Sequence, residues 1–326
     1  MLPGFHRPWE QNIINKDQYD EIASQVAGFL FHNVVSQDDP ALVGGGPDAP
    51  IIEIEAKLGH IIDRNMNHRL RLPVRTETIL DTQDPGLKVQ FRSSMTDMQH
   101  RHFNQFLNQI YMDSKRGALD PEPSRVPLEY LHTRECDSFY ELPPDQYDIL
   151  PRTIRETRNP RHSVRVRATT DQKTGKVIKK IIKTRIADLN VYSPLTAFDW
   201  RISVNMEMPY NGDLERLTPA GGGGANSSDG DRNKDRMSYR HIIYQVDLTQ
   251  VTDVSIPRRF PSVRRADILQ KHGKKEHELE VEVDGEEIRK QGMLLREKRP
   301  NSYEQLIKGF VDNVRVLIRA VPPPER

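Results

Sequence analysis

The chain has 326 residues, of which 48 are Lys or Arg and 47 are Asp or Glu, so its formal net charge is only +1. This balance excludes a global basic field, and any site for phosphate or nucleic acid must therefore be a local concentration of charge. The single cysteine, Cys136, excludes an intrachain disulfide and a cysteine metal cluster, and it fits a reducing compartment.

Three helices are predicted, at the start, in the middle and at the end of the chain. Residues 1–15 are expected to be an N-terminal extension without the apolar run of a signal peptide. No segment is apolar enough to span a membrane, so we expect a soluble, intracellular protein. Asp17 can cap the first helix, and Ser302 and Gln305 form a capping-box pattern for the last. The segment Asp38–Pro50 is rich in Gly and Pro and is expected to be a loop. The helices predicted from apolar spacing are Asp17–Val35, Thr96–Tyr111 and Ser302–Ala320.

Between the helices, apolar residues recur at every second position, which predicts β-strands. A turn at 172–175 is expected to join strands 164–170 and 177–192 as a hairpin, and the Gly- and Ser-rich segment 219–231 is expected to be a disordered surface loop. These elements predict a single α+β domain over residues 1–326, built on a closed antiparallel barrel of about eight strands with supporting helices. The other predicted strands are Ile51–Leu58, Ser163–Ala168, Arg201–Met208, Arg232–Ser238 and Glu278–Val283, with Val126–Thr133 and Ser138–Leu142 as further candidates.

Several of these strands carry charged residues on one face and apolar residues on the other. Glutamates repeat at Glu53 and Glu55, and again at Glu278, Glu280 and Glu282. Each run taken alone can be a solvated face, and that alternative stays open at this point. Like charges on adjacent strands repel one another and are unfavourable partners. The repulsion would be offset if the acidic faces converged on a metal ion and the basic faces on phosphate. The basic runs are Arg165 and Arg167, Lys183 and Arg185, and Arg232, Lys234 and Arg236, while Arg201 and Glu207 share a further face.

The pattern therefore predicts a barrel with a charged interior. A barrel of about eight strands encloses room for its own side chains or for one small ligand. Carboxylates are the ligands that Mg²⁺ or Mn²⁺ prefers, and Arg and Lys bind phosphate oxygens, Arg as a forked donor. Such an interior suits a divalent cation together with a triphosphate.

The motifs resemble those of a known enzyme family. Glu53-Ile54-Glu55-Ala56-Lys57 resembles the Glu-x-Glu-x-Lys signature of the triphosphate tunnel metalloenzymes. His277–Val283 and Arg232–Arg236 resemble the second acidic strand and the basic strand of the fungal branch, the RNA 5′-triphosphatase or mRNA-capping enzyme beta subunit. Segments 181–194 and 199–207 resemble the strands between, so the resemblance covers nearly the whole chain from about Asp17 onward.

The resemblance assigns roles to individual residues. Glu207 matches the acid that orients the attacking water, and Glu278 and Glu280 match further essential acids. Asp247 matches another functional acid. Its number is odd and that of Arg236 is even, so a regular two-residue alternation would place the two side chains on opposite faces. We therefore expect Asp247 to face inward only if a bulge or break intervenes. The metal ligands would be Glu53, Glu55 and Glu282, and the phosphate-binding cations would be Lys57, Arg165, Arg167, Lys183, Arg201, Arg232, Lys234 and Arg236, with Arg165 and Arg167 as rivals for one position.

The family also implies a biological setting. Its members are nuclear homodimers that convert the 5′ triphosphate of nascent pre-mRNA to a diphosphate, and they hydrolyse free nucleoside triphosphates with manganese or cobalt. They dock on the mRNA guanylyltransferase, the capping enzyme alpha subunit, through a segment N-terminal to the catalytic part. No convincing segment of that kind is recognised in this sequence.

Two other functions remain open from the sequence. The same fold can act on inorganic or small organic triphosphates, and a non-catalytic nucleic-acid-binding scaffold would carry the same charged strands exposed to solvent. Direct in-line attack by water needs no covalent intermediate, so Cys136 is not expected to be a nucleophile.

Other residues give weaker signals. No aromatic-plus-basic platform for stacking bases is visible. The arginine pairs at 258–259 and 264–265 either guide RNA at the tunnel mouth or are loop charge. His241, His272 and His277 lack metal-ligand spacing.

Overall fold

The computed structural model describes residues 20–42, 48–119, 125–157, 163–220, 231–254 and 275–322, together with residues 10, 12–15, 18 and 46. Most of the predicted extension at 1–15 and of the predicted loop at 219–231 lies outside these residues. The same holds for His272 and for the arginine pairs at 258–259 and 264–265.

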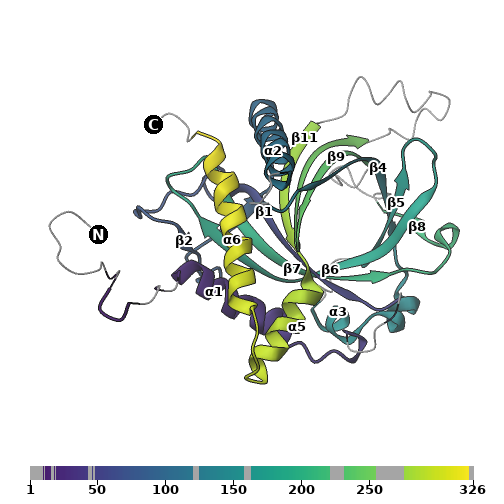
Figure 1. The fold of residues 1–326 in the computed structure, drawn as a ribbon. Helices are drawn as coiled ribbons and strands as arrows, with labels where there is room; N and C mark the ends of the chain where they lie inside the picture. The colour runs from purple at the N-terminus through teal and green to yellow at the C-terminus, as the bar shows by residue number, and fades with distance from the viewer. Residues whose placement is uncertain are drawn as a thin grey trace.

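Eight antiparallel strands close into a barrel, as the sequence predicted (Figure 1). Around the barrel the order is β11-β10-β9-β4-β5-β6-β7-β1, and pairing of β1 with β11 closes the ring. The short strands β2 (Thr78–Ile79), β3 (Val89–Arg92) and β8 (Thr218–Pro219) pair with β6, β1 and β4. The barrel strands are β1 (Ile51–Asp63), β4 (Glu129–Glu141), β5 (Arg165–Asp171), β6 (Val177–Tyr192), β7 (Asp199–Pro209), β9 (Asp231–His241), β10 (Tyr244–Val254) and β11 (Lys275–Val283).

The helices lie on the outside of the barrel (Figure 1). α1, α5 and α6 pack together along one side, and α2 runs past β10 and β11. Among the described residues, no helix is both long and apolar enough to cross a membrane. The helices are α1 (Glu21–Leu30) with its π-helical continuation η1 (Phe31–Val35), α2 (Asp97–Ala118), α3 (Arg152–Thr157), α5 (Gly285–Arg296) and α6 (Tyr303–Ala320), and the 3-10 turns are η2 (Pro40–Leu42), η3 (Pro144–Ile149) and η4 (Leu214–Arg216).

The apolar core of this protein lies outside the barrel and not within it. The outward faces of the strands carry fully buried side chains such as Ala56, Val204 and Val281. They belong to one cluster with the apolar stripe of α6, which includes Phe310 and Val314. Burying each large apolar side chain contributes about 1.5–3 kcal/mol. The apolar side chains of the alternating pattern therefore point outward to the helices, and the charged side chains point into the barrel.

Glycine allows α5 to begin beside the barrel wall. Gly285, the first residue of α5, lies so close to β1 that a Cβ atom would be 2.1 Å from the carbonyl oxygen of Ile52. Any larger residue would push α5 away from the end of the barrel where the acidic strand β11 finishes.

Two predicted helix caps differ from those observed. The side chain of Asp20, and not of Asp17, caps α1 by accepting a hydrogen bond from the Ala23 backbone N–H at 3.0 Å. Asp17 lies outside the described residues. Ser302 makes no side-chain cap bond because its backbone is not extended there (φ −119°, ψ 23°). Its own N–H donates to Gln291 Oε1 at 2.9 Å, which fixes the start of α6 against α5.

Element boundaries and number also differ from the sequence prediction. The two candidates at 126–133 and 138–142 are one strand, β4, because its charged middle pairs with both β5 and β9. The second helix extends beyond Tyr111 to Ala118, and its capping box joins Thr96 and Gln99. The strand β10 and the helix α5 were not predicted.

Candidate active site

The predicted charged faces meet in one cavity inside the barrel, with a volume of about 360 Å³. Glu55, Glu207 and Glu280 are only 1%, 3% and 8% exposed, so these carboxylates are not a solvated face. The enclosed arrangement excludes that alternative for the runs that line the cavity. The lining residues are Ile51, Ile52, Glu53, Glu55, Lys57, Arg167, Lys179, Lys183, Glu207, Arg232, Lys234, Arg236, Glu278, Glu280, Glu282, Val283 and Gly285.

Three carboxylates from β10 and β11 form a tight group. Oxygens of Asp247, Glu280 and Glu282 lie within 4.8 Å of one another. Burial raises the pKa of Glu282 to about 8, and the charges of Asp247, Glu53 and Glu280 add to the rise. Burial also raises the pKa of Asp247. This wall therefore has a local excess of negative charge, and its hard oxygen donors are of the type that binds Mg²⁺ or Mn²⁺.

Asp247 lies on the inward face of β10 without the bulge that the sequence prediction required, although it does not itself line the cavity. β9 and β10 are joined by the two-residue turn Ile242-Ile243, and Ile242 has a positive φ of 58°. A two-residue turn pairs odd with even positions, so Asp247 lies opposite Ser238 on the inward face of β9. The parity comparison with Arg236 was therefore wrong. Arg236 Nη1 contacts Asp247 Oδ2 at 3.1 Å.

The acidic run of β1 is held by Lys183 and Asn205. Lys183 Nζ contacts Glu53, lies 3.4 Å from Glu55 Oε2, and lies 3.7 Å from Glu207 Oε1. Asn205 Nδ2 donates to Glu53 Oε2 at 2.8 Å and to Glu55 Oε1 at 3.1 Å. Burial raises the pKa of Glu53, and the Lys183 charge opposes that rise. Glu55 lies directly opposite Glu282 on β11, so the three predicted metal ligands share one region of the wall.

Glu207 is surrounded by cations. Lys179 Nζ donates to Glu207 Oε2 at 2.8 Å, and Arg167 Nη2 donates to Oε1 at 3.3 Å. Burial would raise the pKa of Glu207, but the charges of Lys183, Lys179 and Arg167 together lower it. The carboxylate is therefore ionised at neutral pH. Lys179 was not predicted, although it has the same parity as Lys183 on β6 and could have been found from that spacing.

The basic strand β9 supplies a second wall. Arg232 Nη2 donates to Glu278 Oε1 at 3.1 Å, and Lys234 pairs with the buried Asp137 of β4. Asp137 was not predicted, because nothing in the sequence of β4 marks it off from the other charged residues there. Lys57 on β1 bridges Glu280 and Glu55, which raises its pKa against the opposing effect of burial.

Two arginines have donors available for an anion. The Nε atoms of Arg167 and Arg236 are buried and have no hydrogen-bond partner among the described residues. Buried N–H groups without a partner are unfavourable, and phosphate oxygens in the cavity would accept from them. This observation fits a phosphate ligand and does not depend on the family resemblance.

The predicted cations Arg201 and Arg165 do not line this cavity. Arg201 Nε donates to Asn190 Oδ1 at 2.8 Å, and its guanidinium lies over the ring of Phe91. Arg165 lines an adjacent pocket with Arg167, so the two predicted rivals occupy neighbouring positions. The half-buried Cys136 does not line the cavity.

Neither described candidate histidine lines the cavity. The ring of His277 lies 4.3 Å from that of His100 on α2, and its Nδ1 is 3.2 Å from Asp97 Oδ1. Burial lowers the pKa of His241.

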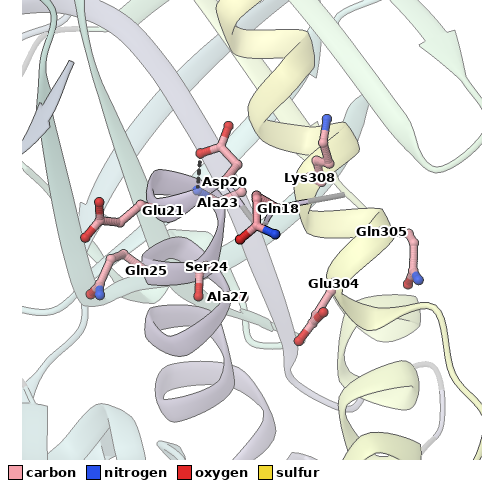
Figure 2. Close-up of a pocket in the computed structure, with 10 residues that line it drawn as sticks. All are labelled: Gln18, Asp20, Glu21, Ala23, Ser24, Gln25, Ala27, Glu304, Gln305 and Lys308. Atoms are coloured by element: carbon pink, nitrogen blue, oxygen red, sulfur yellow. Dashed lines mark hydrogen bonds between the residues drawn. The ribbon is translucent and has the colours of Figure 1, made fainter. Parts of the chain in front are cut away.

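A larger groove of about 950 Å³ lies between α1 and α6 on the outside of the barrel (Figure 2). Its walls are mostly uncharged or acidic, with Glu21 and Glu304 on opposite helices and Lys308 at one end. The groove has neither the facing carboxylates nor the cationic wall of the barrel interior, so we do not assign the chemistry to it.

A closed antiparallel barrel whose interior opposes carboxylates to cations defines a triphosphate tunnel hydrolase. The sequence profile described as "mRNA capping enzyme, beta chain" matches residues 16–323 of this chain. The chain belongs to this family and is a hydrolase of mRNA capping, as the sequence predicted.

Similar proteins agree with this assignment. The mRNA-capping enzyme subunit beta of Schizosaccharomyces pombe is 30% identical over 313 residues, which cover 95% of this chain and 84% of that protein. The subunit of the same name from Cryptococcus neoformans is 28% identical, over 83% of this chain and 57% of that protein. The solved structure of the S. pombe Pct1 RNA triphosphatase in complex with the Spt5 CTD has a TM-score of 0.74 at 28% identity, covering 96% of this chain and 100% of that one.

Proposed function

We propose that the chain removes the γ-phosphate from the 5′ triphosphate of nascent pre-mRNA, the first step of cap formation, and leaves a diphosphate end. The enclosed cavity carries this proposal, because carboxylates and cations from β1, β5, β6, β7, β9 and β11 converge there. Hydrolysis of free nucleoside triphosphates with manganese or cobalt would be a second activity of the same site. The family and the Pct1 structures support an RNA substrate.

The divalent cation would be Mg²⁺ or Mn²⁺, held by Glu53, Glu55 and Glu282. The observed group of Glu282 with Asp247 and Glu280 supports this wall as the cation site. Burial raises the pKa of Glu282 and the neighbouring carboxylates add to the rise, so a cation would offset the negative charge that gathers there. When bound, the ion supplies Lewis-acid polarisation of a phosphoryl oxygen.

The remaining steps belong to the residues of the chain. Glu207 accepts a hydrogen bond from the attacking water and holds it in line with the γ-phosphorus, because an ionised carboxylate is a strong acceptor. Its lowered pKa makes it a positioning group more than a proton acceptor in the free protein. Arg167 and Arg236 donate their unpaired Nε–H groups to phosphoryl oxygens. Charge that develops in the transition state is then stabilised by preorganised donors.

Release of γ-phosphate from 5′-triphosphate RNA, measured with and without Mg²⁺ or Mn²⁺, tests the proposal. Glu55→Ala and Glu282→Ala should each abolish release while the protein still folds. Glu286→Ala is a matched control, since this glutamate is exposed on α5. Activity that survives in both cavity variants, or that needs no metal, would refute the proposal.

The two alternatives make different predictions. A hydrolase of inorganic or small organic triphosphates would have a higher kcat/KM for tripolyphosphate than for triphosphate RNA. A non-catalytic scaffold would expose its charged strands, whereas Glu55 and Asp247 are 1% and 0% exposed. We therefore favour an enzyme, and the ratio of kcat/KM values decides its substrate.

We extend the proposal to the setting of the reaction. A capping-enzyme beta chain is expected to act with the mRNA guanylyltransferase in the nucleus, and we propose that this chain does so as a homodimer. Light scattering of the purified protein would test the dimer, and co-purification with the guanylyltransferase would test the partner. A monomer in solution would contradict the first, and absence of binding at micromolar concentrations would contradict the second.

A further inference from the structure

A second pocket of about 320 Å³ lies beside the catalytic cavity. It is lined by Phe139, Arg165, Arg167, Lys183, Arg185 and Asn205. Arg167 and Lys183 line both spaces, so the second pocket continues the cavity toward β4 and the start of β5. A ligand whose phosphate tail fills the cavity can therefore place the group attached to that tail in this pocket.

The charge of the second pocket differs from that of the cavity. Among the described residues that line it, four are cations and none is a carboxylate. Its cations do contact acids that lie outside the lining: Lys183 contacts Glu53, Arg167 Nη2 lies 3.3 Å from Glu207 Oε1, and Arg185 Nη1 pairs with Asp188. The cavity, by contrast, mixes cations with glutamates that can hold a metal ion. A lining whose charged members are all cations suits phosphate without a bound metal.

Phe139 is the unusual member of the lining. Its cross-strand partner is Arg167, so the ring shares the inward face of the barrel with the phosphate-binding cations. The side chain is half-buried and belongs to neither of the apolar clusters formed by the described residues. An aromatic ring on a charged inner face is not needed for core packing, and it offers a flat surface for a nucleobase.

We infer that this pocket binds the first nucleotide of the RNA, with the base stacked on Phe139 and the adjoining phosphate held by Arg165 and Arg185. The inference rests on the proposed function and assigns the part of the substrate beyond the triphosphate. No aromatic-plus-basic platform was visible in the sequence. The platform is assembled from β4, β5 and β6, so its members are not adjacent in the sequence. A volume near the lower limit of about 300 Å³ for ligand pockets suits one nucleotide.

The test is Phe139→Leu, which keeps an apolar side chain and removes the aromatic ring. Kinetics are compared on triphosphate RNA, on ribose 5′-triphosphate and on tripolyphosphate, because the last two have no base. Stacking on an aromatic ring changes affinity by about 5- to 150-fold. We expect KM for triphosphate RNA to rise about tenfold, with kcat changed by less than about twofold. The two substrates without a base should change by less than about twofold.

Two further variants complete the experiment. Phe139→Trp keeps a stacking surface and should retain the preference for RNA over tripolyphosphate. Phe106→Leu makes the same chemical change on α2, outside the barrel, and should leave all three substrates unchanged. An unchanged KM for RNA in Phe139→Leu, or an equal loss on all three substrates, would overturn the inference. Wild-type protein that cleaves tripolyphosphate but not triphosphate RNA would instead overturn the proposed function.

Discussion

Replacing Glu207 with Gln tests whether this carboxylate positions the attacking water. The substitution keeps the shape of the side chain and removes its charge. Arg167, Lys179 and Lys183 then lose the carboxylate that they contact at 3.3, 2.8 and 3.7 Å. Their positive charge is left for the phosphate, so substrate binding should not weaken.

The size of the effect follows from the hydrogen bond that is lost. A hydrogen bond to an ionised group contributes about 1.5–3 kcal/mol, which corresponds to roughly 10- to 150-fold in rate when the bond acts in the transition state. We therefore expect kcat to fall by about two orders of magnitude, while KM stays equal or falls by up to about tenfold.

The assay is steady-state release of γ-phosphate from triphosphate RNA, with Glu215→Gln as the control because Glu215 is exposed outside the barrel. Circular dichroism would verify that Glu207→Gln is folded. A kcat within about threefold of the wild-type value would refute the assigned role. A KM that rises strongly with kcat unchanged would show that Glu207 binds substrate and does not position water.

Three further predictions concern residues outside the catalytic role. Cys136→Ser should keep the rate within about twofold, and a large loss would overturn direct attack by water. Asp199→Asn should lower the free energy of unfolding by about 3 kcal/mol, as followed by urea denaturation, because the fully buried carboxylate binds Arg69. Burial and the nearby His277 lower the pKa of His100 to about 4 from 6.5. The neutral ring therefore stabilises the fold fully above pH 6.5 and progressively less as pH falls toward about 4, by roughly 1–2 kcal/mol after solvent screening. His100→Phe should remove that acid sensitivity in urea unfolding, and unchanged sensitivity would contradict the assignment.

Local pattern was sufficient to predict most of the barrel and its inward faces. Alternation at Glu53 and Glu55, and again along β9 and β11, depends only on the two-residue period of a strand. That period fixes which side chains share a face, so the acidic and basic walls could be predicted before any contact between them was known. A closed barrel was then predicted because it would enclose both the acidic and the basic side chains away from solvent.

Features that depend on how one strand pairs with another could not be predicted. Asp247 was misplaced because parity changes across the two-residue turn between β9 and β10, and β10 itself was not recognised. Phe139 was not singled out because its cationic neighbours come from other strands. The bulge between Arg185 and Ala187 reverses the parity of β6, which brings Asp188 to the inward face beside Arg201. Such effects arise from register, which the sequence of one strand does not contain.

The central claim is that one sheltered cavity holds a divalent cation and a phosphate tail together. A crystal grown with Mn²⁺ and tripolyphosphate would test it through the anomalous signal of manganese. We predict a peak inside the barrel, about 2.2 Å from carboxylate oxygens of Glu53, Glu55 or Glu282, with phosphate between it and Arg167 and Arg236. A manganese peak outside the barrel, or phosphate bound only on the outer surface, would contradict the account.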